Sequence, residues 1–316
     1  MEGAGTRRTT TKNQTVCVTG AGGFVASWLV HRLLRRGGYT VHGTARDPDD
    51  AKNAHLAALG GAAARLRLFR ADLLDRGGVA AAVAGCDGVF HVASPVPSCN
   101  PSDPEVNGGA PILAPTVNVL RACAEAKVKR VVVVSSLSAV LVNPGWPEGK
   151  AMDEDCWSDV DYCRATENWY CLSKTLAELE AFDYAKKSGL DAVTVCPSLV
   201  IGPLLQSTLN ASSSFVVDYL KGDREVKSKL RSFVDVRDVA DALLLVYESP
   251  EASGRLICNA HQRKVSDVID LLRFVQVSDN PMFSTKKLEM LGWKFMPLEV
   301  TLRDSVESFR AKGILD

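Results

Sequence analysis

A glycine-rich turn between a β-branched run and an apolar helix pattern constrains this chain more than any other feature. Thr15–Thr19 runs directly into Gly20-Ala-Gly22-Gly23, and the helix pattern follows over 24–36. A strand, a tight glycine turn and a helix in this order let backbone N–H groups approach a pyrophosphate at the positive end of the helix. A plain turn between any strand and helix is the alternative. We predict dinucleotide contacts from Gly20, Gly22, Gly23, Phe24 and Val25.

Short β-branched runs alternate with helix patterns through the first half of the chain, which is typical of stacked βαβ units. Right-handed crossovers place such strands in one twisted sheet with helices on both faces. The predicted fold class is therefore α/β, with a Rossmann-like doubly wound parallel sheet. The predicted strands are 15–19, 40–44, 66–70, 88–92, 130–135 and 192–196, and the predicted helices are 24–36, 51–59, 79–84, 115–126 and 166–187.

The pattern becomes irregular after Pro197, which indicates a second, smaller part of the molecule. We predict a disordered tail over 1–13, a dinucleotide-binding domain over 14–198, and a C-terminal substrate-binding lobe over 199–232 and 259–316. Segment 233–258 contains an apolar helix pattern and is predicted to return to the first domain. A chain of 316 residues that is 46% hydrophobic is long enough for this arrangement.

Charge and cysteine usage narrow the class of partner. Lys+Arg and Asp+Glu both number 37, so no overall field gathers nucleic acid or an anionic membrane. No run approaches the ~18 apolar residues of a membrane span. The nine cysteines form no C-x-x-C pair and several lie in apolar runs, which indicates a reducing compartment. With a polar N-terminus that lacks an apolar core, the sequence predicts a cytoplasmic protein that acts on a small molecule.

The end of the second predicted strand indicates which dinucleotide binds. An acidic residue there would hold the 2′-hydroxyl of NAD, whereas Arg46 would accept the 2′-phosphate of NADP. Lys52 follows at a distance that lets it join the same phosphate, although three aspartates crowd the loop. We predict NADP as the cofactor, with a solvated loop arginine as the alternative. Residues after the third and fourth strands are predicted to contact the adenine and the ribose-pyrophosphate region: Asp72, Leu73, Ala93 and Ser94.

A candidate catalytic group follows the fifth predicted strand. Ser136 ends that strand, at the carboxyl edge where parallel sheets bind ligands, and Tyr170 and Lys174 share one face of the next long helix. A nearby cation favours an ionised phenol, so the pair can deliver a proton to a developing alkoxide. We predict that Ser136 orients a substrate carbonyl, that Tyr170 protonates it, and that Lys174 tunes Tyr170 and bonds the nicotinamide ribose. A helix cap is the alternative for Ser136. The predicted cofactor contacts are completed by Tyr170, Lys174, Pro197 and Leu199.

Two other enzyme classes lack their sequence signals, and one non-catalytic function stays open. A serine hydrolase would need a G-x-S-x-G elbow, and a zinc dehydrogenase would need clustered His and Cys ligands, so no metal site is predicted. A non-catalytic NADP-binding protein stays open. Cys163 and Cys171 flank the tyrosine segment as either a redox-sensitive pair or, the favoured alternative, two reduced cysteines packed near a helix start.

Six segments together resemble the plant branch of the extended short-chain dehydrogenases, the group of cinnamoyl-CoA reductase and dihydroflavonol reductase. The resemblance covers 16–316 and implies that Ser136, Tyr170 and Lys174 are the family's triad, with Arg46 and Lys52 on the NADP phosphate. It implies a cinnamoyl-CoA reductase-like enzyme of phenylpropanoid metabolism and lignin biosynthesis, which reduces an acyl-CoA thioester to an aldehyde or a related carbonyl to an alcohol. The segments are TGAGGFVASWLV (19–30), GTARDPDDAKNAHL (43–56), GVFHVASP (88–95), KRVVVVSS (129–136), NWYCLSK (168–174) and FVDVRDVADA (233–242).

Three departures from this resemblance bear on the substrate. Cinnamoyl-CoA reductases have NWYCYGK where this chain has Leu172-Ser173, and a histidine and a lysine where it has Phe215 and Asp218. Loss of that basic pair predicts a weaker grip on the phosphates of CoA, so a free phenylpropanoid aldehyde or another carbonyl is an alternative acceptor. The connection at 274–278 is also shorter than in the family, which bears on the wall of the substrate lobe.

Overall fold

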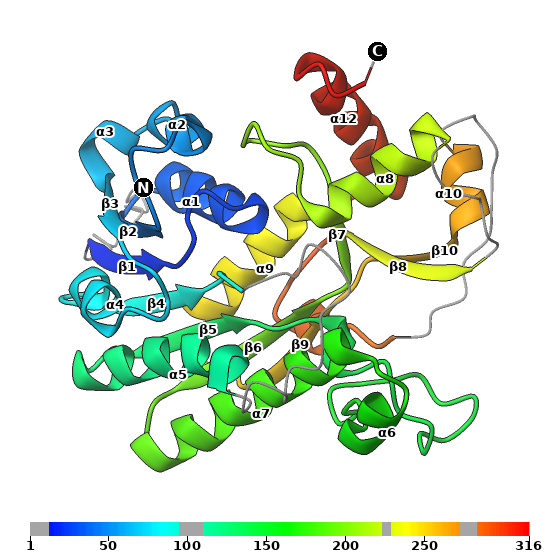
Figure 1. Cartoon of the computed structure of the whole chain (residues 1–316), viewed down its shortest axis with the longest axis horizontal. Coiled ribbons are helices and arrows are strands. Elements are labelled where there is room, and N and C mark those ends of the chain that lie inside the picture. The colour runs from blue at the N-terminus through cyan, green and yellow to red at the C-terminus, as the bar shows by residue number, and fades with distance from the viewer. Residues whose placement is uncertain (1–12, 95–109, 223–228, 272–282, 316) are drawn as a thin grey trace, which may run out of the picture.

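The structure is a computed structural model that describes residues 13–94, 110–222, 229–271 and 283–315. Its centre is a seven-stranded parallel sheet with strand order β3-β2-β1-β4-β5-β6-β9 (Figure 1). The order reverses between β1 and β4, which is where doubly wound sheets open a ligand crevice. The predicted fold class is confirmed. The strands are β1 Gln14–Val18, β2 Tyr39–Ala45, β3 Leu66–Arg70, β4 Gly88–His91, β5 Arg130–Val134, β6 Ala192–Pro197 and β9 Gly254–Cys258.

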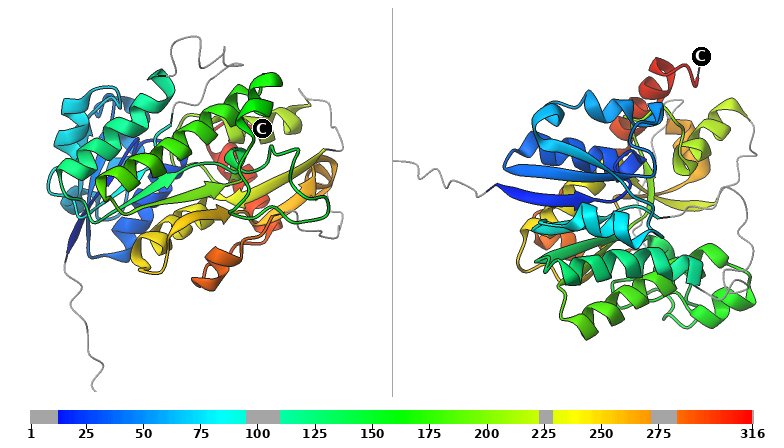
Figure 2. Two further views of the ribbon diagram at one scale, coloured as in Figure 1. Left: turned by 90° about the horizontal axis from the view of Figure 1, so that it is seen from below. Right: turned by 60° about the vertical axis from the view of Figure 1, so that its left-hand side comes forward.

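Helices cover both faces of this sheet (Figure 2). One face packs against α1 (Phe24–Arg36) and α9 (Val236–Glu248), and the other against α4 (Arg76–Val83), α5 (Ala110–Glu125) and α7 (Trp169–Ser188). The interior strand β5, with the sequence RVVVV, has its first three valines buried. Strands covered on both faces favour such continuous apolar runs over alternating ones.

A second sheet of three strands has the order β10-β8-β7. It is formed by β7 (Leu199–Ile201), β8 (Leu230–Asp235) and β10 (His261–Lys264), with β7 parallel and β10 antiparallel to β8. Ile201 and Phe233 contribute to an apolar cluster with helices α8 (Ala211–Lys221), α10 (Val265–Leu271) and α12 (Leu298–Ala311). The sequence analysis predicted a second part of the molecule after Pro197 but did not predict these three strands.

The short elements differ most from the prediction. The predicted helix over 166–187 begins at Trp169, because Glu167 has a left-handed φ of 53° and Asn168 caps the helix. The predicted helix over 51–59 is a 3-10 turn followed by one helical turn. The remaining short elements are η1 (Ala51–Asn53), α2 (Ala54–Ala57), α3 (Ala62–Arg65), η2 (Leu137–Ala139), α6 (Val160–Ala165) and α11 (Lys286–Met290).

None of the helices in the described ranges is long and apolar enough to cross a membrane. The shortened connection at 274–278 lies outside the described residues, as does the predicted tail except for Asn13.

Candidate functional site

The glycine turn joins β1 to α1 and is fixed between two neighbouring strands. At the end of β2, Thr44 accepts from Gly20 N through Oγ1 and from Ala21 N through its carbonyl oxygen, both over 2.9 Å. Gly20 has φ +64°, and a Cβ there would lie 2.8 Å from the Cβ of Ala93, beyond the end of β4. Only glycine fits this left-handed, tightly packed position.

Helix α1 begins immediately after this turn, and no side chain caps its first N–H groups. Gly23 is the N-cap residue, and its N–H donates to Gly20 O over 2.8 Å. Uncapped N–H groups at the positive end of a 13-residue helix form a site for an anion such as a pyrophosphate. The structure therefore brings together the five residues predicted for this turn: Gly20, Gly22, Gly23, Phe24 and Val25.

A buried hydrogen-bond chain fixes the backbone that follows β4. Thr19 Oγ1 accepts from Val92 N over 3.0 Å and from Ala93 N over 2.9 Å. The Thr19 hydroxyl has one hydrogen, which it donates to His91 Nδ1 over 3.1 Å. The other ring nitrogen, Nε2, then carries the imidazole hydrogen and donates it to Thr116 Oγ1 over 3.3 Å. Burial lowers the pKa of His91 to about 4, which keeps the ring neutral. The predicted contact Ala93 is thereby held against the glycine turn.

The loop after β2 carries the predicted 2′-phosphate ligands. Arg46 is exposed, and among the described residues its guanidinium forms no ion pair. Lys52 is committed to Asp50, with 2.7 Å between Nζ and Oδ2, and Asp47 is paired with Arg70 at 2.7 Å. Arg70 also lies 3.8 Å from Asp49, so all three crowding aspartates have a cationic neighbour, and Arg46 is left as the available cation.

The predicted adenine contacts follow β3, beside this loop. Asp72 is exposed, and its Oδ1 accepts from Leu74 N over 2.9 Å. Asn118 Nδ2 donates to Leu73 O over 2.9 Å, which ties the segment to α5. Both residues therefore lie at the carboxyl edge of the sheet, next to the strand that leads to Arg46.

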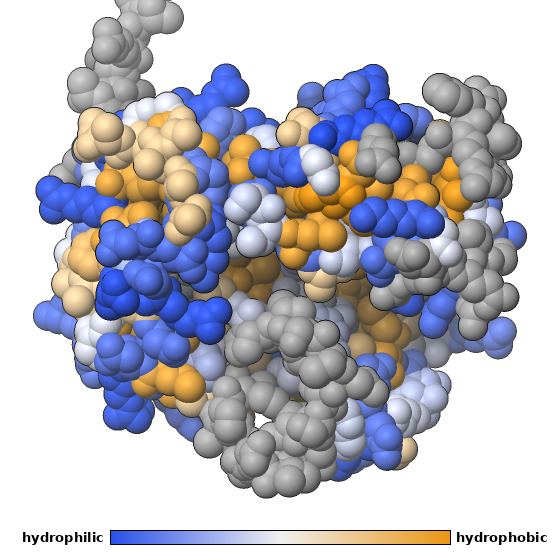
Figure 3. Space-filling model, turned by 45° about the horizontal axis from the view of Figure 1, so that its top comes forward, coloured by the Kyte–Doolittle hydropathy of each residue, from blue (hydrophilic) through white to orange (hydrophobic). Residues whose placement is uncertain are grey.

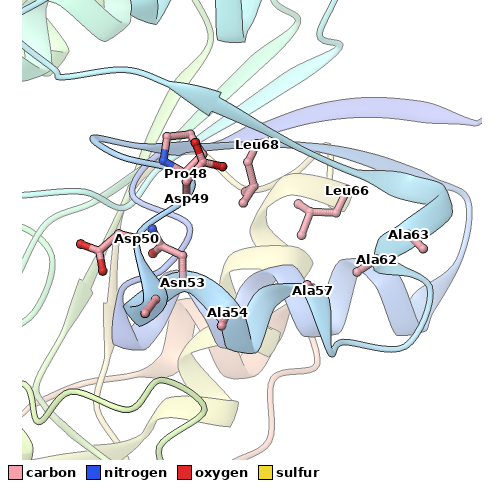
Figure 4. Close-up of a pocket in the computed structure, with 11 residues that line it drawn as sticks. Pro48, Asp49, Asp50, Asn53, Ala54, Ala57, Ala62, Ala63, Leu66 and Leu68 are labelled. Carbon is pink, nitrogen blue, oxygen red and sulfur yellow. The ribbon is translucent and has the colours of Figure 1, made fainter.

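A cavity of about 320 Å³ lies on the other side of the same loop (Figure 4). Leu66 and Leu68 of β3 point into it toward α2. Asn53 separates it from the glycine turn, since a Cβ at Gly22 would lie 1.9 Å from Asn53 Oδ1. None of the predicted site residues lines this cavity, so it is distinct from the predicted site. Its lining is Pro48, Asp49, Asp50, Ala51, Asn53, Ala54, Ala57, Ala62, Ala63, Leu66 and Leu68.

Ser136 and Tyr170 meet at the carboxyl end of β5. Ser136 Oγ accepts from Ser138 N over 3.1 Å, so the predicted alternative, a helix cap, is confirmed, and the substrate-orienting role stays a prediction. Its hydroxyl also hydrogen-bonds the phenol of Tyr170, which lowers the Tyr170 pKa, but burial outweighs this effect and holds the pKa above its usual value. Lys174 is not among the groups that shift it. The tuning of Tyr170 by Lys174 therefore stays a prediction.

Lys174 reaches instead to the end of β4, where its Nζ donates to Ser94 Oγ over 2.8 Å. Burial lowers the pKa of Lys174 to about 8, while Glu178 and Cys196 act in the opposite direction. The amine thus stands between the helix that carries Tyr170 and the turn beside the glycine cradle. The structure thus shows two contacts at this edge of the sheet, Ser136 with Tyr170 and Lys174 with Ser94, with Tyr170 and Lys174 one turn apart on α7.

The carboxyl ends of β6 and β9 supply further polar groups. Ser198 lies between the predicted contacts Pro197 and Leu199, and its N–H donates to Cys258 O over 3.0 Å. Ser198 Oγ and Asn259 Oδ1 are buried and have no hydrogen-bond partner among the described residues. Buried polar atoms without partners are costly and point to a ligand. Sequence reasoning missed both, because one polar residue in an apolar run carries no signal.

The molecule is hollowed between the part that carries α1 and α2 and the part that carries α8 and α12 (Figure 3). Helix α8 begins at Ala211 and carries both Phe215 and Asp218. The Phe215 ring packs at 4.9 Å from that of Tyr219 on the next turn, and Asp218 lies on the same helix. The two departures from the basic pair are thus on α8, where they present an aromatic ring and a carboxylate.

Cys163 and Cys171 are buried free thiols in one apolar cluster with Leu172. Burial raises the pKa of both, that of Cys171 to about 11. A thiol is reactive only as the thiolate, so this environment favours two reduced packing cysteines over a redox-sensitive pair.

A doubly wound sheet with a glycine cradle at its switch point, and a serine, tyrosine and lysine at the same edge, defines a nucleotide-dependent oxidoreductase. Residues 16–259 match the NAD dependent epimerase/dehydratase family. The chain belongs to this family, the extended short-chain dehydrogenases.

Relatives and solved structures agree with this assignment. The chain is 46% identical over 318 residues to cinnamoyl-CoA reductase 1 of Petunia hybrida, an alignment that covers 96% of this chain and 94% of the relative. Vestitone reductase from alfalfa (Medicago sativa) superposes with a TM-score of 0.82 at 30% identity, covering 96% of this chain and 100% of the other. Gre2 of Candida albicans in complex with NADPH gives a TM-score of 0.80 at 26% identity, covering 95% and 99%. The predicted enzyme class, an NADP-dependent oxidoreductase of the extended short-chain dehydrogenase type, is confirmed.

Proposed function

We propose that this protein reduces a hydroxycinnamoyl-CoA thioester to the corresponding aldehyde with NADPH. The observation that carries the proposal is a pair of contacts beside the glycine cradle at one edge of the sheet, Ser136 with Tyr170 and Lys174 with Ser94. The identity of 46% to a cinnamoyl-CoA reductase over nearly the whole chain supports the thioester as substrate.

The residues present fit NADPH. The cradle at Gly20 excludes any side chain, and the uncapped start of α1 suits a pyrophosphate. Arg46 suits a 2′-phosphate, because planar guanidinium groups bind phosphate through two parallel hydrogen bonds. Ser198 Oγ and Asn259 Oδ1 are buried without a hydrogen-bond partner among the described residues, and the carboxamide of nicotinamide would supply hydrogen-bonding groups of the kind they lack. When bound, NADPH supplies the hydride that converts the thioester and a proton to the aldehyde and the CoA thiol, and is itself oxidised to NADP⁺.

Tyr170 donates the proton to the carbonyl oxygen in this proposal. The Ser136 hydroxyl interacts with the phenol and lowers its pKa, so it can donate a hydrogen bond to the phenolic oxygen as that oxygen gains negative charge. Because burial keeps the phenol protonated at neutral pH, a proton is available when negative charge develops on the substrate. Ser136 also holds the position of Tyr170 through its fixed place at the start of η2.

Lys174 contributes charge at the same place. Its pKa of about 8 leaves the ammonium form dominant at neutral pH, and its Nζ is aligned by the Ser94 hydroxyl. A cation there stabilises negative charge that develops on the substrate oxygen. We assign Lys174 this electrostatic role together with a hydrogen bond to the nicotinamide ribose.

Reduction of a free aldehyde or ketone is the second candidate, and Phe215 and Asp218 favour it. These residues on α8 stand where the resemblance implies a histidine and a lysine, so the cations expected to grip CoA phosphates are absent from those two positions. The Phe215–Tyr219 ring pair offers an aromatic surface that suits a phenylpropanoid ring without its CoA.

NADPH oxidation by the purified protein tests both candidates. Feruloyl-CoA, coniferaldehyde and a dihydroflavonol are supplied in parallel, with Tyr170→Phe as the control. We expect turnover of feruloyl-CoA that falls by about 10²–10⁴-fold in the control, while NADPH binding is retained. Turnover of coniferaldehyde alone would establish the second candidate. No turnover of any acceptor by protein that binds NADPH would overturn both.

We extend the proposal to the division of labour along the chain. Residues 14–198 together with 233–258 would hold the cofactor, and 199–232 with 259–316 would form the substrate lobe. The pairing of β9 with β6 in the seven-stranded sheet supports this, although β8 pairs in the second sheet as far as Asp235. A role in phenylpropanoid and lignin metabolism is proposed from the relatives, and the cytoplasmic location from cysteine usage.

A further inference from the structure

A buried ion pair lies next to the candidate catalytic group, and no sequence motif pointed to it. Glu178 on α7 and Arg255 on β9 are 0% and 5% exposed and join over 3.0 Å between Oε1 and Nε. A second contact joins Arg255 Nη2 to Glu178 Oε2 over 3.2 Å. Burying two charges is costly unless their remaining polar atoms are also satisfied, so the rest of their contacts decide what the pair does.

Glu178 accepts hydrogen bonds from the end of β5 and from β6, the two strands next to the candidate site. Its Oε2 accepts from Ser135 Oγ over 2.7 Å, and its Oε1 accepts from Thr194 Oγ1 over 2.5 Å and from Cys196 Sγ over 3.4 Å. Ser135 is the residue directly before Ser136. The carboxylate is thus held as an anion by the guanidinium and three further donors, and it fixes the backbone that presents Ser136.

Arg255 donates hydrogen bonds to backbone carbonyls that follow Ser136 in the chain. Its Nη2 donates to Ala139 O over 3.0 Å, at the end of η2. Its Nη1 donates to Cys156 O over 2.6 Å and to Glu154 O over 3.2 Å, and the guanidinium lies 3.5 Å from the centroid of the Trp157 ring. The pair therefore holds the chain both before and after Ser136.

The same pair acts on Lys174 through charge. Glu178 follows Lys174 by one helical turn on α7, and its carboxylate opposes the burial that drives the lysine toward its neutral form. Tyr170 precedes Lys174 by one turn on α7, and Cys196 of β6 and His91 of β4 interact electrostatically with Lys174. Burial keeps the tyrosine, the thiol and the imidazole neutral near pH 7. Glu178 is thus the anion among these groups, and Arg255 on β9 offsets part of its field.

We propose that the Glu178–Arg255 pair is a positioning unit for the reduction, which holds the Ser136 segment in place and keeps Lys174 charged without itself contacting substrate or cofactor. The proposal rests on the proposed function, in which Ser136, Tyr170 and Lys174 carry the reaction.

Glu178→Gln is the first test, because it keeps the volume and removes the charge. We expect the alkaline limb of kcat/KM to move down by about one pH unit, so that kcat/KM falls about twofold at pH 7 and about tenfold above pH 9, with little change in NADPH affinity. The ionisation of Lys174 is followed separately by NMR of labelled lysine side chains, assigned with Lys174→Arg, and should move in parallel. A merely structural role would lower activity by the same factor at every pH.

A double variant, Glu178→Met with Arg255→Met, separates positioning by charge from stability. Apolar replacement of a whole buried pair is often neutral for stability, so the thermal midpoint should recover relative to Glu178→Gln. The limb should nevertheless stay displaced, because the anion is absent. Asp191→Asn is the matched control, since Asp191 pairs with Arg130 over 2.7 Å at the opposite end of β5 and β6. It should leave the pH profile unchanged.

The possible results separate a failure of the proposed function from a failure of the Glu178–Arg255 positioning unit. A wild-type protein with no turnover on any carbonyl overturns the proposed function and this inference with it. An active wild type whose pH profile and lysine titration are unchanged in Glu178→Gln overturns only the positioning unit. A displaced limb that persists in the double variant, with an unmoved control, supports it.

Discussion

Lys174 of α7 donates a hydrogen bond from Nζ to Ser94 Oγ over 2.8 Å, one turn after Tyr170 on the same helix. The bond ties the helix that carries the proposed acid to the segment after β4, which is itself packed against the glycine turn at Gly20. The proton donor and the proposed cofactor cradle therefore share a fixed frame. A substitution at the glycine turn should therefore also affect the position of Tyr170, and a substitution on α7 should affect the glycine turn.

The alkaline limb of the pH profile should belong to Lys174. The pKa of its amine is lowered to about 8, whereas the pKa of Tyr170 is raised above its usual value, so the lysine loses its proton first as pH rises. We expect kcat/KM to fall about tenfold per pH unit above pH 8. The measurement is kcat/KM across pH 6 to about 10, the range that brackets both groups.

Lys174→Arg checks that assignment. Arginine stays charged throughout this range, so the limb near pH 8 should disappear even though overall activity is lower, because the guanidinium does not match the Ser94 contact. Lys187→Arg, an exposed position on the same helix that pairs with Asp183, should leave the profile unaltered. A limb that stays in place in Lys174→Arg would assign the titration to another group.

Gly20→Ala should weaken both folding and NADPH binding. The new Cβ would have to occupy a left-handed conformation, at a cost of about 1–2 kcal/mol, and would also meet the Cβ of Ala93 at 2.8 Å. Thermal unfolding and NADPH titration measure the two effects. Gly189→Ala is the matched control, since Gly189 has φ +73° with nothing within 4 Å and bears only the backbone cost.

The double variant Gly20→Ala with Ala93→Gly isolates the steric part. It removes the partner of the clash, so affinity for NADPH should recover at least partly relative to Gly20→Ala alone. Equal affinity of Gly20→Ala and wild type would argue against a close-packed cofactor turn at this position.

Asp238 should make the protein less stable as pH rises toward neutrality. Burial raises the pKa of its carboxyl to about 7, although Met296 N donates to Oδ2 over 2.7 Å. Between about pH 4 and 7 the folded state binds more protons than the unfolded state, so the free energy of unfolding falls across that window. Asp238→Asn should then raise the thermal midpoint at pH 8 by a few degrees, and the gain should vanish near pH 4.

Asp183→Asn, an exposed carboxylate on α7, serves as the reference for that measurement and should show no pH-dependent gain. If Asp238→Asn and wild type differ by the same amount at both pH values, the carboxyl of Asp238 does not titrate in this window.

The first half of the fold and the proposed catalytic residues were predictable because their signals are local. The glycine turn after β1 and the Tyr170–Lys174 spacing each lie within a few residues of chain. The alternating pattern then places Ser136 at the same sheet edge, since parallel strands share their carboxyl ends.

The second sheet and the Glu178–Arg255 pair were not predictable, for physical reasons. Strand β7 has three residues and β10 is the polar run HQRK, so neither shows the apolar alternation that marks a strand. Glu178 and Arg255 are 77 positions apart, and each alone resembles a solvated surface charge in the sequence. Only the packing of α7 against β6 and β9 brings them together.

Arg46 should contribute more to cofactor choice than Lys52. Arg46 forms no ion pair among the described residues, whereas the Lys52 ammonium is held 2.7 Å from Asp50. A charge-assisted bond to phosphate is worth about 1.5–3 kcal/mol, so Arg46→Ala should weaken NADPH binding roughly 10- to 100-fold and leave NADH binding unchanged. Lys52→Ala should cost only a few-fold, and Asp50→Asn should tighten NADPH binding by releasing Lys52. Titration of each variant with both dinucleotides measures the differences, and unchanged NADPH affinity in Arg46→Ala would make Arg46 a solvated loop residue.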